Sequence, residues 1–134
     1  MANNESMEMY LETIYLLEKS EGHAHSVDIS KKLGVTKASV TKATKNLKQA
    51  GYIVKEPYGS ITLTDKGRAL SEEVYRKHEL IKFFLIETLE VSSKDAADNA
   101  CRLEHVLTKT VIDAIEAFLI KRGKYEQCEY SGIS

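Results

Sequence analysis

The chain has 134 residues, of which 43% are hydrophobic and 29% charged, and its formal net charge is −1. This composition argues against global disorder and suits one compact domain or two small ones that share a helix. Two cysteines cannot build a disulfide framework, the N-terminal residues lack the apolar stretch of a signal peptide, and no apolar run approaches the length of a membrane span. We therefore expect a cytoplasmic protein with reduced thiols and no membrane partner.

The small net charge conceals a strongly basic segment. Residues 23–55 carry seven Lys and only one acid, Asp28, whereas residues 1–22 carry five acids and one Lys. Residues 56–134 carry eleven bases and fourteen acids. A basic segment between acidic flanks is typical of a local nucleic-acid surface.

Two helices are predicted at the start of the chain. The segment "ESMEMYLETIYLLEKSEG", residues 5–22, has apolar residues at a helical period and ends at Gly22. The segment "SVDISKKLGV" predicts a short helix that is capped by Ser26 and ends at Gly34.

A third helix is predicted in "TKASVTKATKNLKQAGYI", with Thr36 as its cap and Gly51 at its end. Val40 and Leu47 are expected to face inward. Because a tight glycine turn separates this helix from the second, the three helices indicate a helix-turn-helix. Two short β-rich runs, 52–55 and 60–63, then flank a Pro-Tyr-Gly turn, and a β-hairpin at this place makes the domain a winged helix.

The rest of the chain is predicted to be helical. Thr64 is expected to cap a long helix that ends near Leu89, and the next helix is expected to start at Ser92 or Ser93 and to continue through "ACRLEHVL". A last helix, "KTVIDAIEAFLIKR", ends at Gly123. The predicted fold is mainly α, with an N-terminal winged helix-turn-helix over 1–74 and a helical dimerisation and metal-binding domain over 75–134.

The third predicted helix carries a polar, basic side. Hydroxyl groups near its N-terminal end can approach base edges, and lysines can neutralise phosphates. Lysines are also common on an ordinary solvated face, but the helix-turn-helix spacing and the wing favour binding to double-stranded operator DNA. The candidate DNA-binding residues are Thr36, Lys37, Ser39, Thr41, Lys42, Lys45 and Lys48, with Lys55 and Tyr58 from the wing.

The C-terminal half holds more large apolar residues than a small winged helix needs for its own core. Because single recognition helices of this kind usually work as symmetric pairs, this surplus predicts a homodimer interface. The alternative is a self-contained helical subdomain. The surplus residues are Phe83, Phe84, Ile86, Leu89, Val111, Ile115, Phe118 and Leu119.

Potential metal ligands occur in "ACRLEHV", residues 100–106. If the stretch is helical, Cys101, Glu104 and His105 stand at i, i+3 and i+4 on one face. The three alone are a weak signal, because a single cysteine is more often a small buried hydrophobe. Further donors are Met9 and Glu12, at i and i+3 in the first helix, and His78 in the long helix.

With these motifs, the chain resembles the DtxR/MntR family of metal-dependent transcriptional repressors. The resemblance covers nearly all of residues 6–120 and resides in five blocks in order: "MEMYLETIYLL", "VTKASVTKATKNL", "ITLTDKGRAL", "RKHELIKFFL" and "ACRLEHVL". It implies an N-terminal winged helix that binds operator DNA, a helical part that forms the dimer, and an Fe²⁺ or Mn²⁺ ion that switches on DNA binding. The chain is similar to the short form, without the SH3-like domain of iron-branch members.

The family's ligands match this chain in a mixed pattern. The iron-responsive branch uses Met, Cys, Glu and His at the positions of Met9, Cys101, Glu104 and His105. The manganese branch has acids where this chain has Met9 and Cys101, but it uses a Glu and a His at the positions of Glu12 and His78. The metal candidates implied by the resemblance are thus Met9, Glu12, His78, Cys101, Glu104 and His105.

The resemblance leaves the ion and its number open. In the iron branch's second site, a Glu and a His stand where this chain has Lys82 and Ala97, so one or two ions per subunit are expected. Thioether and thiolate donors favour later, softer metals than Mn²⁺, which prefers oxygen. Fe²⁺ is therefore the expected ion, with Mn²⁺ as the alternative.

The expected function is a homodimeric, metal-dependent repressor of metal-uptake genes. One alternative is a metal-independent winged-helix regulator that senses redox state or a small ligand through Cys101, and another is a metal-buffering or structural protein. No nucleophile–base pair or phosphate-binding loop stands out, so an enzyme is not expected. His23 and His25 are expected to be solvated loop residues, and Cys128 an exposed thiol in the tail.

Overall fold

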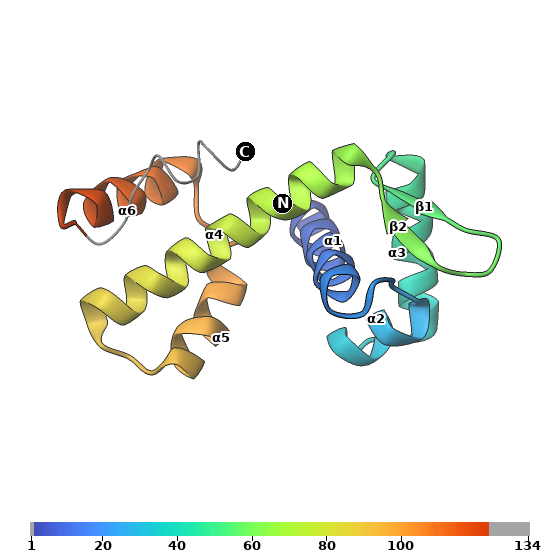
Figure 1. Cartoon of the computed structure of the whole chain (residues 1–134), viewed down its shortest axis with the longest axis horizontal. Helices are drawn as coiled ribbons and strands as arrows, with labels where there is room; N and C mark the ends of the chain where they lie inside the picture. The colour runs from blue at the N-terminus through green and yellow to red at the C-terminus, as the bar shows by residue number, and fades with distance from the viewer. Residues whose placement is uncertain (1, 124–134) are drawn as a thin grey trace. The chain divides into compact units, whose positions relative to one another are not determined.

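The computed structural model describes residues 2–123, which form six helices and one two-stranded sheet in two compact units, Met1–Tyr75 and Arg76–Ser134 (Figure 1). The elements are α1 (Ala2–Glu21), α2 (Ser26–Leu33), α3 (Lys37–Gln49), β1 (Ile53–Lys55), β2 (Ile61–Leu63), α4 (Asp65–Leu89), α5 (Ser93–Leu103) and α6 (Lys109–Lys121). The order confirms the predicted mainly α fold with a small hairpin after the helix-turn-helix. No helix among these residues is both long and apolar enough to span a membrane.

The first unit is built around α1. The apolar residues of α1 recur at a helical period, so one side of this helix meets α2, α3 and the hairpin. Val40 and Leu47 face inward from α3, as predicted, and are buried. The core residues are Tyr10, Leu11, Ile14, Tyr15, Leu17, Ala24, Ile29, Val40, Leu47, Ile53, Ile61 and Leu63.

The turn between α2 and α3 has the predicted local chemistry. Gly34 ends α2 with a φ of 68°, a left-handed conformation that favours glycine, and its N–H donates to the Ser30 carbonyl. Thr36 caps α3, because its side-chain oxygen accepts a hydrogen bond from the Ser39 N–H at 3.1 Å. The predicted cap at Ser26 is wrong. Ser26 is already the first helical residue, and the cap position belongs to His25, which makes no side-chain capping bond.

The wing is an antiparallel hairpin in which Ile53 pairs with Leu63 and Lys55 with Ile61. A contact that the pattern did not predict joins it to the α1–α2 connection: Ala24 pairs with Ile61, whose N–H donates to the Ala24 carbonyl at 2.8 Å. The base of the wing also passes close to α4, and a Cβ at Gly67 would collide with the Tyr52 carbonyl. Only glycine therefore fits at this position without a shift of the backbone.

A largely buried acid joins three elements of the first unit. Glu18 of α1 accepts a hydrogen bond from the Leu63 N–H of β2 at 2.9 Å and pairs with Arg68 of α4 at 3.0 Å. The first turn of α4 is thus held against α1 by charge as well as by apolar packing.

The next residue of α1, Lys19, lies with its ammonium 4.9 Å from the Tyr15 ring centroid, and a hydrogen bond with Tyr15 raises the pKa of this ammonium.

Helix α4 begins at the predicted cap, since Thr64 accepts from the Gly67 N–H at 3.1 Å, and it ends at Leu89 as expected. The boundary between the units falls inside this helix. The second unit has its own core, and Phe84 and Phe118 meet edge to face beside it, with ring centroids 5.8 Å apart. The buried members of this core are Leu80, Ile81, Ala100, Ile112 and Leu119.

Much of the predicted hydrophobic surplus packs within the second unit. Leu119 is buried in its core, and Phe83, Phe84, Ile115 and Phe118 pack against that core. Leu89 and Val111, by contrast, are 62% and 42% exposed. Because those four residues are only partly buried, they and the two exposed ones still leave apolar surface on this unit.

Candidate functional site

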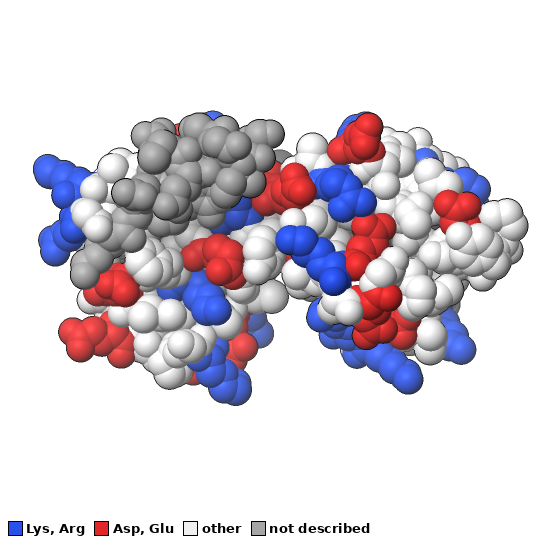
Figure 2. Space-filling view, in the orientation of Figure 1, with Lys and Arg blue, Asp and Glu red and all other residues white. Residues whose placement is uncertain are grey.

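The nine candidate DNA-binding residues all lie in the first unit and all are exposed. Helix α3 has opposite faces: Val40, Thr44 and Leu47 are buried, whereas its lysines reach solvent. Tyr58, at the tip of the wing, is 77% exposed although it is a large aromatic residue. Figure 2 shows, in addition, basic side chains gathered over the α2 region of this unit.

Helix α3 is also accessible beside α1. A cavity of about 500 Å³ lies between the two helices, and Ser39 and Lys42 of α3 line it together with Met7 and Tyr10 of α1. The Ser39 hydroxyl, which also accepts a hydrogen bond from the Thr36 hydroxyl at 3.0 Å, and the Lys42 side chain therefore stand at the edge of an open hollow. This arrangement leaves them accessible to a polyanionic ligand.

Two of the metal candidates lie in α1, within the first unit. Met9 is 40% exposed, and its carbonyl accepts a hydrogen bond from the Thr13 hydroxyl at 2.8 Å. Glu12, one turn further along the helix, is buried. The helix therefore presents a thioether and a carboxylate at i and i+3, as the sequence predicted.

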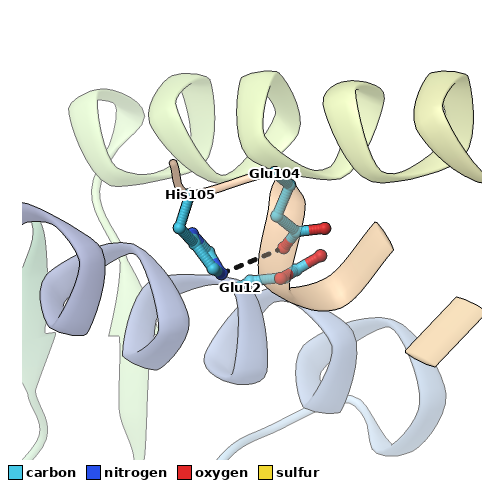
Figure 3. Close-up of side chains that lie close together, drawn as sticks. All are labelled: Glu12, Glu104 and His105. Atoms are coloured by element: carbon cyan, nitrogen blue, oxygen red, sulfur yellow. Dashed lines mark ion pairs between the residues drawn. The ribbon is translucent and has the colours of Figure 1, made fainter. Parts of the chain in front are cut away.

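The second unit brings three of the other candidates together. The His78 Nδ1 lies 2.7 Å from one oxygen of the Glu104 carboxylate, and the His105 Nε2 lies 3.2 Å from the other oxygen. Figure 3 shows the Glu104–His105 pair; Glu12, which it also labels, belongs to the first unit. Glu104 is fully buried, so its carboxylate meets these two imidazoles away from bulk water.

The geometry of "ACRLEHV" differs from the prediction of one continuous helix. Helix α5 ends at Leu103, and Glu104 occupies its C-cap position. His105 and Val106 then donate to the carbonyls three residues earlier, as in the tighter turns that commonly end helices. Glu104 and His105 turn inward at this point, whereas Cys101 remains on the exposed side of α5.

The donor set of the second unit fits a divalent metal ion. A carboxylate and two imidazoles are good ligands for Mn²⁺, Fe²⁺ and Zn²⁺. Neighbouring ligand atoms of one ion lie roughly 3 Å apart when each is about 2.1 Å from it, which agrees with the Glu104–His105 distance of 3.2 Å. The sequence motif identified these residues, but it did not identify Glu18, whose partners are distant in the chain. Cys128 lies outside the described residues.

Comparisons with known proteins agree with this geometry. Residues 4–61 match the family "iron dependent repressor, N-terminal DNA binding domain", and residues 64–130 match "iron dependent repressor, metal binding and dimerisation domain". An HTH-type transcriptional regulator of Methanocaldococcus jannaschii is 37% identical over 119 residues, which are 88% of this chain and 95% of that protein. The HTH-type transcriptional regulator MntR of Lysinibacillus sphaericus is 38% identical over 110 residues, 82% of this chain and 78% of that protein.

Among solved structures, a manganese-dependent transcriptional repressor in complex with manganese has a TM-score of 0.80 and 25% sequence identity. The match covers 89% of this chain and 53% of that chain, so this chain spans about half the length of that repressor. Taken together with the helix-turn-helix, the wing and the buried donor cluster, these matches show that the chain belongs to the iron-dependent repressor family of metal-dependent, DNA-binding transcriptional regulators.

Proposed function

We propose that this chain is a homodimeric repressor of metal-uptake genes, and that it binds operator DNA when a divalent metal ion is bound. The observation that carries the proposal is the buried Glu104 carboxylate between the imidazoles of His78 and His105. The proposal places DNA binding in residues 1–74 and metal binding and dimerisation in residues 75–134. It assigns the protein no enzymatic activity and places its action in the cytoplasm, where its thiols stay reduced.

The proposed ligand set extends the buried cluster. The set contains His78, Glu104 and His105. We add Met9, Glu12 and Cys101 because they match ligand positions of the family in the motifs "MEMYLE" and "ACRLEHV". A bound ion supplies the positive charge that holds these donors together. Each donor must be deprotonated or neutral to bind, so metal affinity should fall as the pH is lowered.

We propose Fe²⁺ as the ion in the cell, with Mn²⁺ as the alternative. The thioether of Met9 and the thiolate of Cys101 favour Fe²⁺, because Mn²⁺ prefers oxygen donors. The carboxylates of Glu12 and Glu104 suit both ions.

The proposed DNA interface is the exposed face of α3 together with the wing. Ser39 and Thr41 are proposed to approach base edges, and Lys42, Lys45 and Lys48 to contact phosphates. Thr36 and Lys37 lie at the N-terminal end of α3, where positive helix-dipole charge favours a phosphate. In the wing, Lys55 and Tyr58 are proposed to lie beside the backbone or minor groove.

The test is an anaerobic DNA-binding titration with Fe²⁺, Mn²⁺, Zn²⁺ and a chelator in parallel. We expect metal to tighten operator binding by at least about 10-fold, a typical lower range for coupled sites. Equally tight binding in the presence of chelator would contradict the metal switch. Binding no tighter than to a charge-matched control DNA would instead favour a metal-buffering or structural protein.

The ion preference is tested at Cys101. Replacement of the thiol by an oxygen donor in Cys101→Asp should raise the response to Mn²⁺ relative to Fe²⁺. Cys101→Ala removes the donor and serves as the reference. An unchanged Fe²⁺ to Mn²⁺ ratio in both variants would remove Cys101 from the ligand set.

A redox-sensing regulator is the second candidate, because the Cys101 thiol is exposed and therefore accessible to oxidants. In this case anaerobically purified protein would hold no metal, and peroxide would change its affinity for DNA. Cys101→Ser would abolish the peroxide effect. Bound metal and no effect of peroxide would exclude this candidate.

A further inference from the structure

A pair of histidines in the first unit has a geometry suited to metal binding. His23 and His25 lie on either side of Ala24 in the connection between α1 and α2, the blue segment between those two labels in Figure 1. Their ring centroids are 4.7 Å apart, with an angle of 65° between the ring planes. The sequence predicted solvated loop residues here, and the structure adds that the two rings are in contact.

The backbone explains why the rings meet. His25 has an extended conformation, with φ −125° and ψ 155°, and Ala24 pairs with Ile61 of the wing in an antiparallel bridge. In an extended segment, residues two apart point to the same side. Because Ala24 is fully buried and its carbonyl accepts the Ile61 N–H at 2.8 Å, the segment is held in this conformation by the sheet.

The imidazole nitrogens are available for a ligand. Within residues 2–123, neither ring makes a hydrogen bond or an ion pair, and the ring contact between them is their interaction. His25 occupies the N-cap position of α2 without using its side chain as a cap. His23 is exposed and His25 is partly exposed, so solvent ions can reach both rings.

We propose that His23 and His25 together bind a divalent ion of the Cu²⁺, Ni²⁺ or Zn²⁺ type, at a site on the DNA-binding unit that is separate from the Glu104 cluster. Imidazole is a preferred ligand of these ions. Two imidazoles that share an ion through bonds of about 2.1 Å have ring centroids roughly 4.6 Å apart when the two bonds meet at a right angle and about 5.3 Å apart at a tetrahedral ion; the observed 4.7 Å is close to the first value. Water completes the coordination.

The bound ion links α1, α2 and the wing. His23 follows the end of α1, His25 precedes the first residue of α2, and Ala24 between them is bonded to β2. An ion on both rings therefore restrains the backbone between the first two helices of the unit. The site does not depend on the proposed repressor function, since its ligands come from a different segment of the chain.

The experiment uses the full chain without an affinity tag and carries Glu104→Gln to weaken the other metal site. Cu²⁺, Ni²⁺ and Zn²⁺ are titrated separately by calorimetry, and the imidazole signals are followed by NMR. We expect one ion per chain with simultaneous shifts of the His23 and His25 signals. Replacement of either histidine by Gln should weaken this binding by at least about 10-fold, because the second imidazole acts at a high effective concentration.

The matched control is Lys31→Gln, an exposed substitution in the neighbouring helix that should leave the affinity unchanged. Far-ultraviolet circular dichroism verifies that the variants are folded. The proposal is overturned if His23→Gln and His25→Gln bind the ions as tightly as the parent chain. It is equally overturned if binding requires the millimolar concentrations typical of a single free imidazole. Neither result would bear on DNA binding that depends on Glu104.

Discussion

Glu18 in the first unit and Glu104 in the second are both acids largely withdrawn from solvent, and their partners differ in chemistry. The Glu18 side chain, 12% exposed, accepts a backbone N–H from Leu63 and pairs with Arg68. The Glu104 side chain, 0% exposed, lies between two imidazoles. A guanidinium is charged at every physiological pH, so the Glu18 contacts are permanent. An imidazole can be neutral and offer a lone pair, so the Glu104 contacts can be exchanged for bonds to a metal ion.

Burial alone therefore does not define a functional acid. Glu18 stabilises the arrangement of α1, β2 and α4, and its partners leave no role for an added cation. Glu104 has two imidazole partners that belong to the proposed ligand set, at a position where the helix has just ended. The two acids should therefore respond in opposite ways when each is replaced.

The largest effect is expected for Glu104→Gln, which keeps the shape of the side chain and removes its charge. Loss of this carboxylate should weaken metal binding by at least about 100-fold, the upper range found even for residues that only support a ligand. Calorimetry with Mn²⁺ or anaerobic Fe²⁺ measures the loss. Asp113→Asn, an exposed acid in the same unit, is the control. An unchanged metal affinity of Glu104→Gln would contradict the different roles assigned here to Glu104 and Glu18.

Glu18→Ala should instead destabilise the first unit, and it should do so even when no metal ion is bound. The buried Leu63 N–H loses its acceptor, which should lower the free energy of unfolding by about 2 kcal/mol. Arg68 is 45% exposed, so water replaces most of its share of the interaction. Urea unfolding of the metal-free chain measures the change, with the exposed Glu73→Ala on α4 as the control. Glu18 would be an incidental surface acid if the two variants were equally stable.

A smaller change in stability is expected to distinguish two hydroxyl residues, one at the N-terminal end of α3 and the other at the N-terminal end of α2. Thr36→Ala removes the observed cap of α3 and should lower the free energy of unfolding by about 1 kcal/mol. Ser26→Ala removes no cap and should change it by less than about 0.5 kcal/mol. Thermal unfolding of the two variants side by side measures the difference. The reverse order of stability would show that Ser26 caps α2 after all.

The smallest change, a change in DNA affinity measured at one salt concentration, is expected for Lys45→Gln. If Lys45 contacts one phosphate, the slope of log affinity against log salt should decrease in magnitude by about one. Fluorescence anisotropy with operator DNA over a range of salt measures this slope. Lys94→Gln, an exposed lysine of the second unit, should leave the slope unaltered. Equal slopes for both variants would remove Lys45 from the interface.

Local sequence signals were sufficient for most of the elements and for part of the site. Thr36, Thr64 and Gly34 act over a few residues, so caps and turns could be assigned without knowledge of the fold. The members of the Glu104 cluster were named as candidates from the sequence: Glu104 and His105 from their spacing in "ACRLEHV", and His78 from "RKHEL" in the long helix. The exact end of α5 was not predicted, because a C-cap without glycine has no strong sequence signal.

The helical period of α1, the basic face of α3 and the candidate metal ligands can all be read from the order of the residues. Which of these groups meet depends on the packing of the elements. The Glu18–Leu63 bond joins residues 45 positions apart, and the Ala24–Ile61 bridge aligns the two histidines from outside their own segment. Cys101 and Glu104 are close in the chain, yet one is exposed and the other buried. Contacts between distant segments depend on how the elements pack, and no local period or cap records that packing.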